Sequence, residues 1–331
     1  MLVEPAIVSG QYKSEGDATI PLEHFYIERH KSGAFRFLLS KLHFSLSTGY
    51  GNTMYKHRLD SFGILQEPDS MPKIFDHNNV NLRYSNWFNT VTPNSYAIAP
   101  GSFLVNPDTA SIGFRSKGLN IPLKATVHVE IGRYRIGGGY SIEYSRVGTF
   151  RPIGFTGDVG NFTPAVRSSF LKKYFGMVGG TFYRYDQYLA GADLNIGGYK
   201  LGNDFDATLI KKGVYYNLGL FAEREFSEYF KVFIRPSFEI RNYELTVPEN
   251  GQTIAHRMNS WYINIGARYR LPELRRCPLK DCHAQINHAH GNREYRSRRH
   301  PIWKKQNPHY GENYPTILKY KGRNKRKLNP Y

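Results

Sequence analysis

The feature that most constrains this chain is a repeated alternation of apolar and polar side chains with a period of two. In one run, Leu123 and Val127 fall on one face, and Lys124 and Glu130 fall on the other. A period of two is that of a β-strand, whose successive side chains point to opposite sides. Eight segments show this pattern, some more cleanly than others: 41–50, 123–131, 135–147, 174–184, 189–199, 213–223, 229–243 and 258–271. The sequence therefore predicts an all-β fold.

The lengths and the spacing of these segments favour strands that cross a membrane. Several have ten or eleven residues, close to the ~9–11 that a tilted strand needs to cross a bilayer. The intervals between the segments alternate between long and short: 51–122, 133–134, 148–173, 185–188, 200–212, 224–228 and 244–257. Outer-membrane barrels have this asymmetry, with tight turns at the periplasmic rim and long loops outside.

Together the two patterns predict an eight-stranded antiparallel transmembrane β-barrel over residues 41–271, with long external loops. The first loop, 51–122, is the longest. An even number of strands brings both ends of the chain to the short-turn side. We therefore expect residues 1–40 and an extended basic tail, 272–331, in the periplasm, with the barrel in the outer membrane.

A soluble β protein is the alternative. A β-sandwich would show the same alternation with its apolar faces turned into a core. The first residues, MLVEPAIVSGQYKSEGD, have neither the basic region nor the apolar core of a signal peptide. Up to this point, the loop parity is the main reason to prefer the membrane.

The last predicted strand ends in a pattern that resembles the assembly signal of outer-membrane proteins. That signal has a polar residue, a glycine two positions later, and hydrophobic residues five and seven positions after the polar one. Here these are Asn264, Gly266, Tyr269 and Leu271. The whole of 41–271 resembles eight-stranded barrels of the OmpA/OmpX type. A barrel with a long periplasmic extension is also similar to the PorG-like accessory barrels of the type 9 secretion system, which implies a structural or accessory role in secretion.

Most of the positive charge lies in the tail. The net charge of the chain is +18, and residues 273–331 contribute +11, with 15 Lys and Arg against 4 Asp and Glu. Basic residues interleaved with aromatic ones suit an acidic surface, so we expect the tail to bind a periplasmic or outer-membrane protein, peptidoglycan or outer-membrane lipid. In the soluble alternative the same residues would bind nucleic acid, and a plain solvated charge run is the third interpretation. The candidate partner-binding residues are Arg293, Arg296, Arg298, Arg299, Trp303, Lys304, Lys305, Tyr310, Tyr314, Lys325, Arg326 and Lys327.

Two cysteines lie close together in this tail, near several histidines. In an oxidising compartment, Cys277 and Cys282 would most often form a disulfide, which is the interpretation we favour. Thiolate and imidazole also suit zinc, so Cys277, Cys282, His288 and His290 are a second interpretation. Their C-x4-C-x5-H-x-H spacing matches no standard zinc finger, and we expect no metal and no cofactor.

Catalysis has little support in the sequence. There is no G-x-S-x-G, H-E-x-x-H, P-loop or Rossmann motif. His57 and Asp60 lie in the long first loop, but no nucleophile accompanies them. We therefore expect a non-enzymatic barrel that acts as an accessory anchor, with its basic tail bound to a periplasmic partner or the cell wall. An outer-membrane enzyme that uses its long loops is the weakest of the hypotheses.

Overall fold

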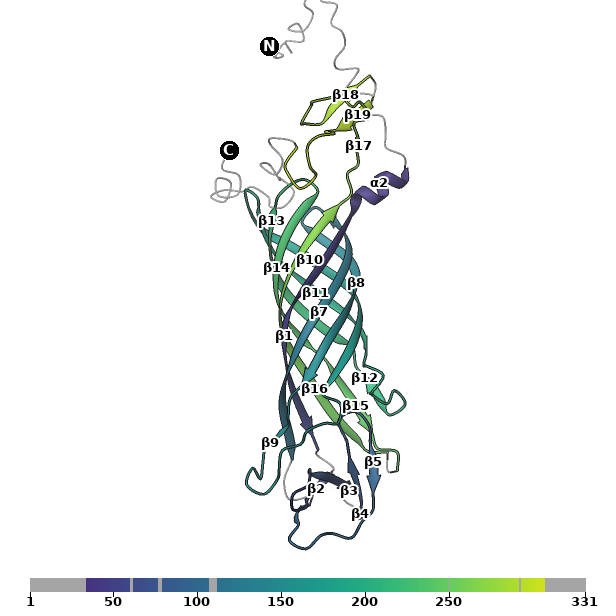
Figure 1. Cartoon of the computed structure of the whole chain (residues 1–331), viewed down its shortest axis with the longest axis vertical. Helices are drawn as coiled ribbons and strands as arrows, with labels where there is room; N and C mark the ends of the chain where they lie inside the picture. The colour runs from purple at the N-terminus through teal and green to yellow at the C-terminus, as the bar shows by residue number, and fades with distance from the viewer. Residues whose placement is uncertain are drawn as a thin grey trace, which may run out of the picture.

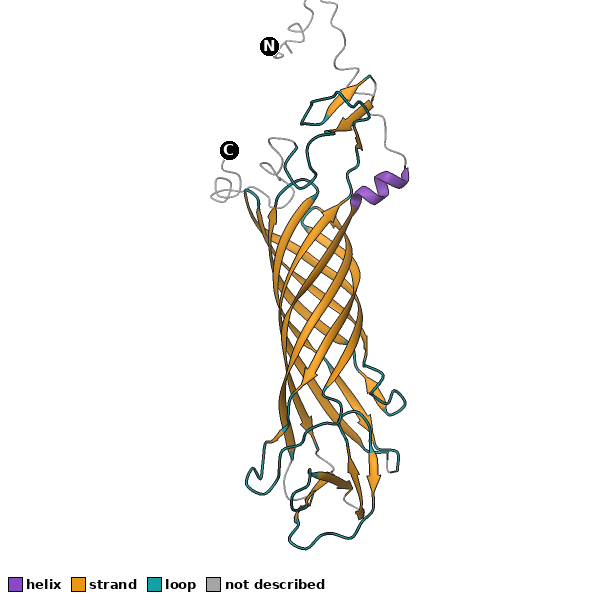
Figure 2. Ribbon diagram, viewed as in Figure 1, coloured by secondary structure: helices purple, strands orange, loops and turns teal. Residues whose placement is uncertain are grey.

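Eight long strands pair edge to edge in a closed ring (Figures 1 and 2). The computed structural model describes residues 34–59, 62–76, 79–106, 112–249, 251–291 and 293–306. The ring strands are β1 (Leu42–Arg58), β7 (Gly113–Ile131), β8 (Tyr134–Val147), β10 (Ser168–Tyr185), β11 (Tyr188–Lys200), β13 (Tyr215–Glu225), β14 (Phe230–Ile240) and β16 (Thr253–Arg270). Each pairs antiparallel with the next. The ring closes where β16 pairs with β1, from His43↔Arg270 to Arg58↔Ala255.

Each of the eight segments predicted from the sequence overlaps one of these strands, but the first loop was predicted with the wrong bounds. β1 continues to Arg58 and β7 begins at Gly113, so the connection between them is 59–112 and not 51–122. The outward side chains near the end of β1 are Lys56 and Arg58, whereas Tyr55 is buried. The apolar–polar pattern thus reverses along this single strand. Its outer end has no apolar outward face from which the sequence could identify it as a strand.

The two ends of the ring differ in how its strands are connected. At one end the connections are the tight turns 132–133 and 186–187 and the short loop 226–229. Gly132 and Asp186 have positive φ angles of 60° and 46°, as tight hairpin turns require. The opposite end carries all the long connections, so the predicted parity of short and long loops holds in the structure.

Small elements extend both ends of the ring (Figure 1). At the short-turn end, α2 (Ala34–Lys41) leads into β1. After β16 the chain forms a three-stranded sheet of β17 (Arg275–Arg276), β19 (Arg293–Arg296) and β18 (His288–His290). The long-loop end holds a five-stranded sheet of β2 (Phe62–Gln66), β3 (Lys73–Asp76), β4 (Asn79–Ser85), β5 (Thr92–Asn94) and β6 (Phe103–Val105), together with β9 (Arg151–Pro152), β12 (Ile210–Lys212) and β15 (Asn242–Thr246).

Among the described residues, no helix has the length and apolar character needed to span a bilayer.

The ring has an apolar outer face and a polar inner face. Leu46, Leu218 and Ile265 point outward and are 58–59% exposed. Arg241 and Glu143, by contrast, point inward and are at most 1% exposed. A soluble sheet protein buries its apolar face and solvates its polar one, so the polarity here is the reverse. We call the outward apolar residues of the eight strands the apolar belt.

A turn from the first long connection fills the long-loop end of the ring. Trp87 is fully buried there and stacks on Phe162, with ring centroids 4.2 Å apart. The Tyr243 hydroxyl donates a hydrogen bond of 2.6 Å to the Phe88 carbonyl oxygen. His57, which the sequence placed in a loop, lies on β1 with its ring 5.2 Å from that of Trp87. Trp87 and Phe88 of the 59–112 connection therefore fill the mouth of the ring.

β14 contains Pro236, which has no N–H to donate to a ladder. Its pairing with β16 continues through Pro236↔Ile263. Its pairing with β13 instead skips from Gly219↔Ser237 to Ala222↔Ile234. The sheet thus tolerates this proline because one of the two ladders is interrupted at that point.

Candidate functional site

The interior of the ring is packed with paired charges along its length. The inward-facing acids are Glu130, Glu143, Asp193, Glu223, Glu225 and Glu239, and the inward-facing bases are Lys124, Arg135, Lys173, Arg184, Lys231, Arg235, Arg241 and Arg268. A buried charge is tolerated only when it is paired and hydrogen-bonded. The acids and bases on the inward faces of the strands therefore pair with one another across the ring.

Glu143 is the centre of the cluster nearest the long-loop end. Lys173 Nζ lies 2.7 Å from one of its oxygens, and Arg241 Nη1 lies 3.1 Å from the other. Tyr262 donates its hydroxyl at 3.0 Å, and Asn120 Nδ2 donates at 2.7 Å. Three of these partners lie on β7, β10 and β16, and Arg241 directly follows β14, so a single carboxylate connects four parts of the wall to β8.

A second cluster lies toward the short-turn end. Arg135 forms two parallel hydrogen bonds of 2.7 Å with Glu223, and Arg268 lies 2.8 Å from the same carboxylate. Glu130 Oε1 lies 3.0 Å from Arg135 Nε and 3.2 Å from Arg268 Nη1. Bidentate pairs of this kind combine strength with a fixed geometry.

Little free volume remains beside the Glu143 cluster. The cavity bounded by Glu143, Lys173, Arg235 and Glu239 has a volume of about 30 Å³. That is room for about one or two water molecules. An eight-stranded closed sheet is just wide enough for its own side chains to fill it, and here they do so with charged groups.

The outer surface carries a row of cations just beyond the apolar belt, toward the long-loop end. Lys56 faces Arg257 on β16 and Arg115 on β7, and Arg115 faces Arg151 on β9. All four side chains are exposed, and none forms a salt bridge with another described residue. Like charges directly opposite one another destabilise a sheet. We call Arg257, Lys56, Arg115 and Arg151 the basic row.

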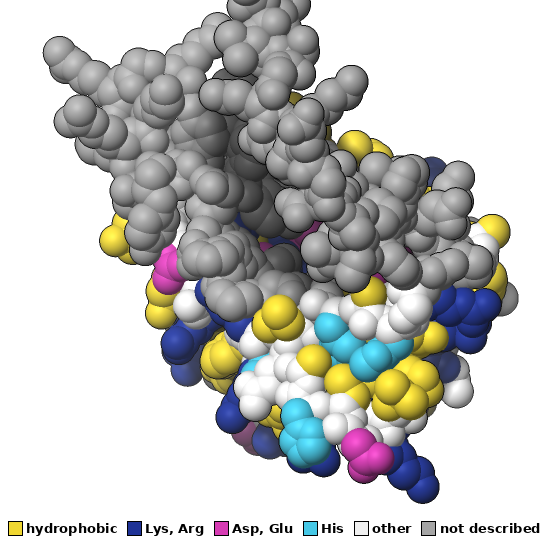
Figure 3. Space-filling view, turned by 90° about the horizontal axis from the view of Figure 1, so that it is seen from above, with side chains coloured by type: hydrophobic (Ala, Val, Ile, Leu, Met, Phe, Trp, Pro, Cys, Tyr) yellow, Lys and Arg dark blue, Asp and Glu magenta, His cyan; other side chains and the backbone are white. Residues whose placement is uncertain are grey.

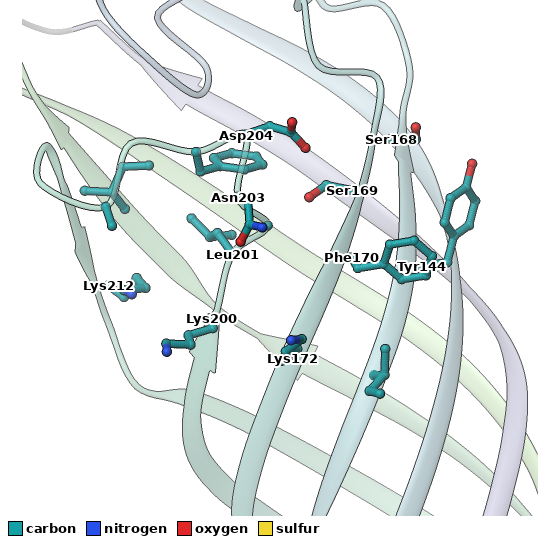
Figure 4. Close-up of a pocket in the computed structure, with 15 residues that line it drawn as sticks. Tyr144, Ser168, Ser169, Phe170, Lys172, Lys200, Leu201, Asn203, Asp204 and Lys212 are labelled. Carbon is teal, nitrogen blue, oxygen red and sulfur yellow. The ribbon is translucent and has the colours of Figure 1, made fainter.

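A groove opens in the same outer zone, on the far side of β8. β11 begins its pairing with β10 only at Lys172↔Lys200, so the outer end of β10 from Ser168 to Leu171 pairs with β8 alone. The chain after β11 swings away from the wall and leaves a cavity of about 850 Å³ (Figure 4). Its walls combine aromatic side chains such as Phe170 with three lysines, Lys172, Lys200 and Lys212.

The four residues of the predicted assembly signal lie at the closing strand. Asn264 points inward, whereas Tyr269 lies between Phe44 of β1 and Phe230 of β14. A Cβ atom on Gly266 would come within 2.7 Å of the Phe233 ring and 2.5 Å of the Leu46 carbonyl oxygen. Only glycine therefore fits where the ring closes. Leu271 follows β16, and the assembly signal stays a prediction.

The beginning of the predicted tail folds against the short-turn end of the ring instead of extending away from it. The Ser227 hydroxyl contacts the Ile302 carbonyl oxygen, and the Gln306 N–H donates to Glu228 at 3.3 Å. Arg36 donates to the Glu273 carbonyl oxygen at 2.8 Å, which connects α2 to the same region. Figure 3 looks onto this end, where histidine side chains gather beside Lys and Arg.

The structure separates the predicted partner-binding residues into groups. Arg293, Arg299, Trp303 and Lys304 are exposed, and Arg296, Arg298 and Lys305 are half-buried. Arg298 is occupied locally, because its guanidinium donates to the Cys277 and Pro278 carbonyl oxygens at 3.2 Å. The remaining candidates, Tyr310, Tyr314, Lys325, Arg326 and Lys327, lie outside the described residues.

The favoured disulfide is not formed in the structure. Cys277 and Cys282 are both free. Ligand atoms of the two cysteines, His288 and His290 lie within 4.8 Å of one another, which is the grouping that the less favoured interpretation named. The basic row, in contrast, was missed, because the predicted loop 51–122 included residues 51–58 of β1 and 113–122 of β7.

No protein-family model and no curated protein matches this chain. Among solved structures, the outer membrane protease OmpT of Escherichia coli is similar at 14% identity over 69% of this chain and 96% of its own, with a TM-score of 0.32. The outer membrane protein OprG of Pseudomonas aeruginosa is similar at 9% identity over 73% and 99% of the two chains, with a TM-score of 0.30. A FadL homologue of Pseudomonas aeruginosa is similar at 10% identity over 74% and 94%, with a TM-score of 0.28. These values are too low to assign a family or an activity.

Substitution of Glu143→Gln tests the charged interior. It leaves Glu239 as the one carboxylate shared by Lys173 and Arg241, so one buried positive charge is in excess, and we expect a loss of about 3 kcal/mol in the free energy of unfolding. Denaturant unfolding of the folded protein in detergent measures the change. Lys173→Met in the same chain removes the excess positive charge, leaves Arg241 paired with Glu239, and should recover part of the loss.

The matched control is Glu67→Gln, which breaks the Glu67–Lys73 pair on the sheet outside the ring. Because that pair is partly exposed, we expect its loss to cost below about 1 kcal/mol. Equal effects of the two substitutions would contradict a stabilising role for the interior network.

Proposed function

We propose that the chain is an outer-membrane β-barrel that acts as a closed anchor and holds its folded C-terminal segment at the periplasmic face. The single observation that carries this proposal is the reversed polarity of the ring. An apolar outer face around a charged, paired interior suits lipid outside and protein inside. In water the same outer face would be an exposed apolar surface far larger than soluble monomers carry.

The packed interior supports an anchor over a pore. A channel needs a continuous water-filled path, whereas the cavity within the charged clusters measures about 30 Å³ and aromatic side chains fill the long-loop end. We therefore propose a non-enzymatic, non-conducting role. The similarity to OmpA/OmpX-type barrels and to PorG-like accessory barrels of a secretion system remains part of this proposal.

The basic row supports a defined contact with lipid. It lies where the apolar belt ends and the long loops begin, at the level that lipid head groups would occupy. Its unpaired neighbouring cations need anions, and the phosphates of an outer-leaflet lipid such as lipid A would supply them. The Lys172–Lys200 pair beside the aromatic groove repeats this combination of cation and apolar surface on β10 and β11.

The exposed basic and aromatic residues at the short-turn end support docking on a periplasmic partner. Arg293, Arg299, Trp303 and Lys304 would present charge and a flat apolar ring to an acidic protein surface or to peptidoglycan. The soluble nucleic-acid-binding alternative uses the same residues, but it leaves the exposed apolar belt without an explanation.

Migration on a detergent gel and conductance in a planar bilayer together test the closed anchor. We expect the unheated protein to migrate differently from the boiled protein, because a closed sheet resists detergent until it is heated. We also expect no stable conductance steps after insertion, because paired side chains fill the interior. Identical migration with and without heating would contradict the barrel, and regular single-channel steps would contradict the closed interior.

Neutralisation of the basic row tests the lipid contact. The triple substitution Lys56→Gln, Arg115→Gln, Arg257→Gln should lower the amount of lipopolysaccharide retained after purification several-fold, because each lost cation removes a phosphate contact. In lipid-free detergent the same change should raise the unfolding midpoint, because it removes cross-strand repulsion.

The matched control replaces Arg133 and Arg224, two exposed cations at the short-turn end of the belt, with glutamine. It should leave lipopolysaccharide retention unchanged. Equal loss in both variants would indicate a general charge effect and would contradict a specific row.

A further inference from the structure

We propose that Cys277, Cys282, His288 and His290 form a tetrahedral zinc site that stabilises the small sheet at the short-turn end of the ring. One ligand atom from each residue lies within 4.8 Å of the other three. Two thiolates and two imidazoles are a complete donor set for structural zinc, which is bound at about 2.0–2.3 Å by four such atoms. Side-chain shifts of about 1 Å would bring the four atoms to that geometry.

The local fold places both histidine side chains on the same face of one strand. His288 and His290 are the first and last residues of β18, and residues two apart on a strand share a face. Their rings are 4.8 Å apart and almost perpendicular, at 85°. The hairpin to β19 turns at Gly291, whose φ of 61° suits glycine. The histidine pair is therefore fixed by backbone pairing.

The hydrogen bonds of the histidines leave ring nitrogens free for a metal. His288 Nδ1 lies 2.9 Å from the Ile286 carbonyl oxygen, which requires Nδ1 to donate and leaves the lone pair on Nε2. That Nε2 faces Cys282 Sγ at 3.1 Å. His290 Nε2 is buried and has no hydrogen-bond partner in the described part of the chain. Metal-binding histidines typically donate their second N–H to a carbonyl in this way.

The cysteine loop is held in place from the opposite side. Cys277 directly follows β17, and its N–H donates to the Arg296 carbonyl oxygen of β19 at 3.1 Å. The Cys282 N–H donates to the Leu279 carbonyl oxygen at 3.4 Å and closes the turn that brings the second thiol back. A metal at this point would connect the β17 loop to the β18–β19 hairpin.

The sheet has almost no apolar core of its own. Of the described residues from 271 to 306, Cys277, at 1% exposure, and Pro272 are the two apolar side chains that are buried. Leu279 and Ile286 are about half exposed, at 52% and 49%. Sheets of this size cannot bury enough apolar surface to fold alone and usually need a metal or a disulfide.

The charge around the cluster also suits two thiolates and a divalent cation. Two thiolates cancel the charge of Zn²⁺, so the complete site is neutral in a strongly basic segment. The other grouping of candidate ligands, His43, His128 and Glu130 inside the ring, lacks this balance. Arg135, Arg268 and Lys231 already lie within 3.0–3.7 Å of Glu130 and would repel a metal ion.

The zinc content of the full-length protein, folded in detergent and dialysed against buffer with trace Zn²⁺, tests the site. We expect about one zinc per chain, and at least about a tenfold lower content in Cys277→Ser and in His290→Ala, because a structural site needs all four ligands. His283→Ala is the matched control, because His283 lies in the same segment but outside the cluster. It should retain the metal.

Cobalt gives a second measurement that does not depend on a variant that folds. Co²⁺ added to the reduced wild-type protein should produce thiolate charge-transfer absorption and the intense visible bands of a tetrahedral site, and Zn²⁺ should remove both. Heat-modifiable migration of each variant shows separately whether the ring has folded.

Three results would overturn the site. The first is wild-type protein with free thiols and no bound zinc. The second is a Cys277–Cys282 disulfide in protein isolated from the envelope. The third is His290→Ala that binds zinc as well as wild type. None of these would affect the evidence for the anchor.

Discussion

The pairing of β16 with β1 is the constraint on which the rest of the structure depends. It removes both edges of the sheet, so the ring strands satisfy their backbone hydrogen bonds with one another. Once the backbone is satisfied, the outer face needs no water, and apolar side chains such as Ile265 can cover it. Gly266 matters here because any larger side chain would displace Phe233 or the Leu46 backbone at the closing contact.

Closure also determines what the interior must contain. Inward side chains from eight strands meet in a narrow space, and polar ones must find partners there. Glu143 and Glu223 each gather cations from several strands, so the charges act as cross-links between strands distant in sequence. We propose that the resulting rigidity suits an anchor, which needs a fixed platform for the segment at its periplasmic rim more than a path through its centre.

Period-two alternation was enough to predict the fold class and the approximate position of each ring strand. It failed at residues 51–58 and 113–122, where outward cations beyond the apolar belt, such as Lys56 and Arg115, no longer contrast with the interior. The basic row was hidden for the same reason. Cys277 and Cys282 are close together in the sequence. The sequence could not show that His288 and His290 lie beside them, because that position depends on the pairing of β18 with β19.

The central claim is that the outer face of the ring contacts lipid while the interior is filled by protein. Fluorescence quenching by phospholipids with brominated acyl chains tests it directly, with one tryptophan retained at a time. Trp261 is 59% exposed on the apolar belt, and Trp87 is fully buried at the long-loop end. We predict strong quenching of Trp261 and almost none of Trp87. A Trp261 that brominated lipid leaves unquenched in the reconstituted protein would contradict the account.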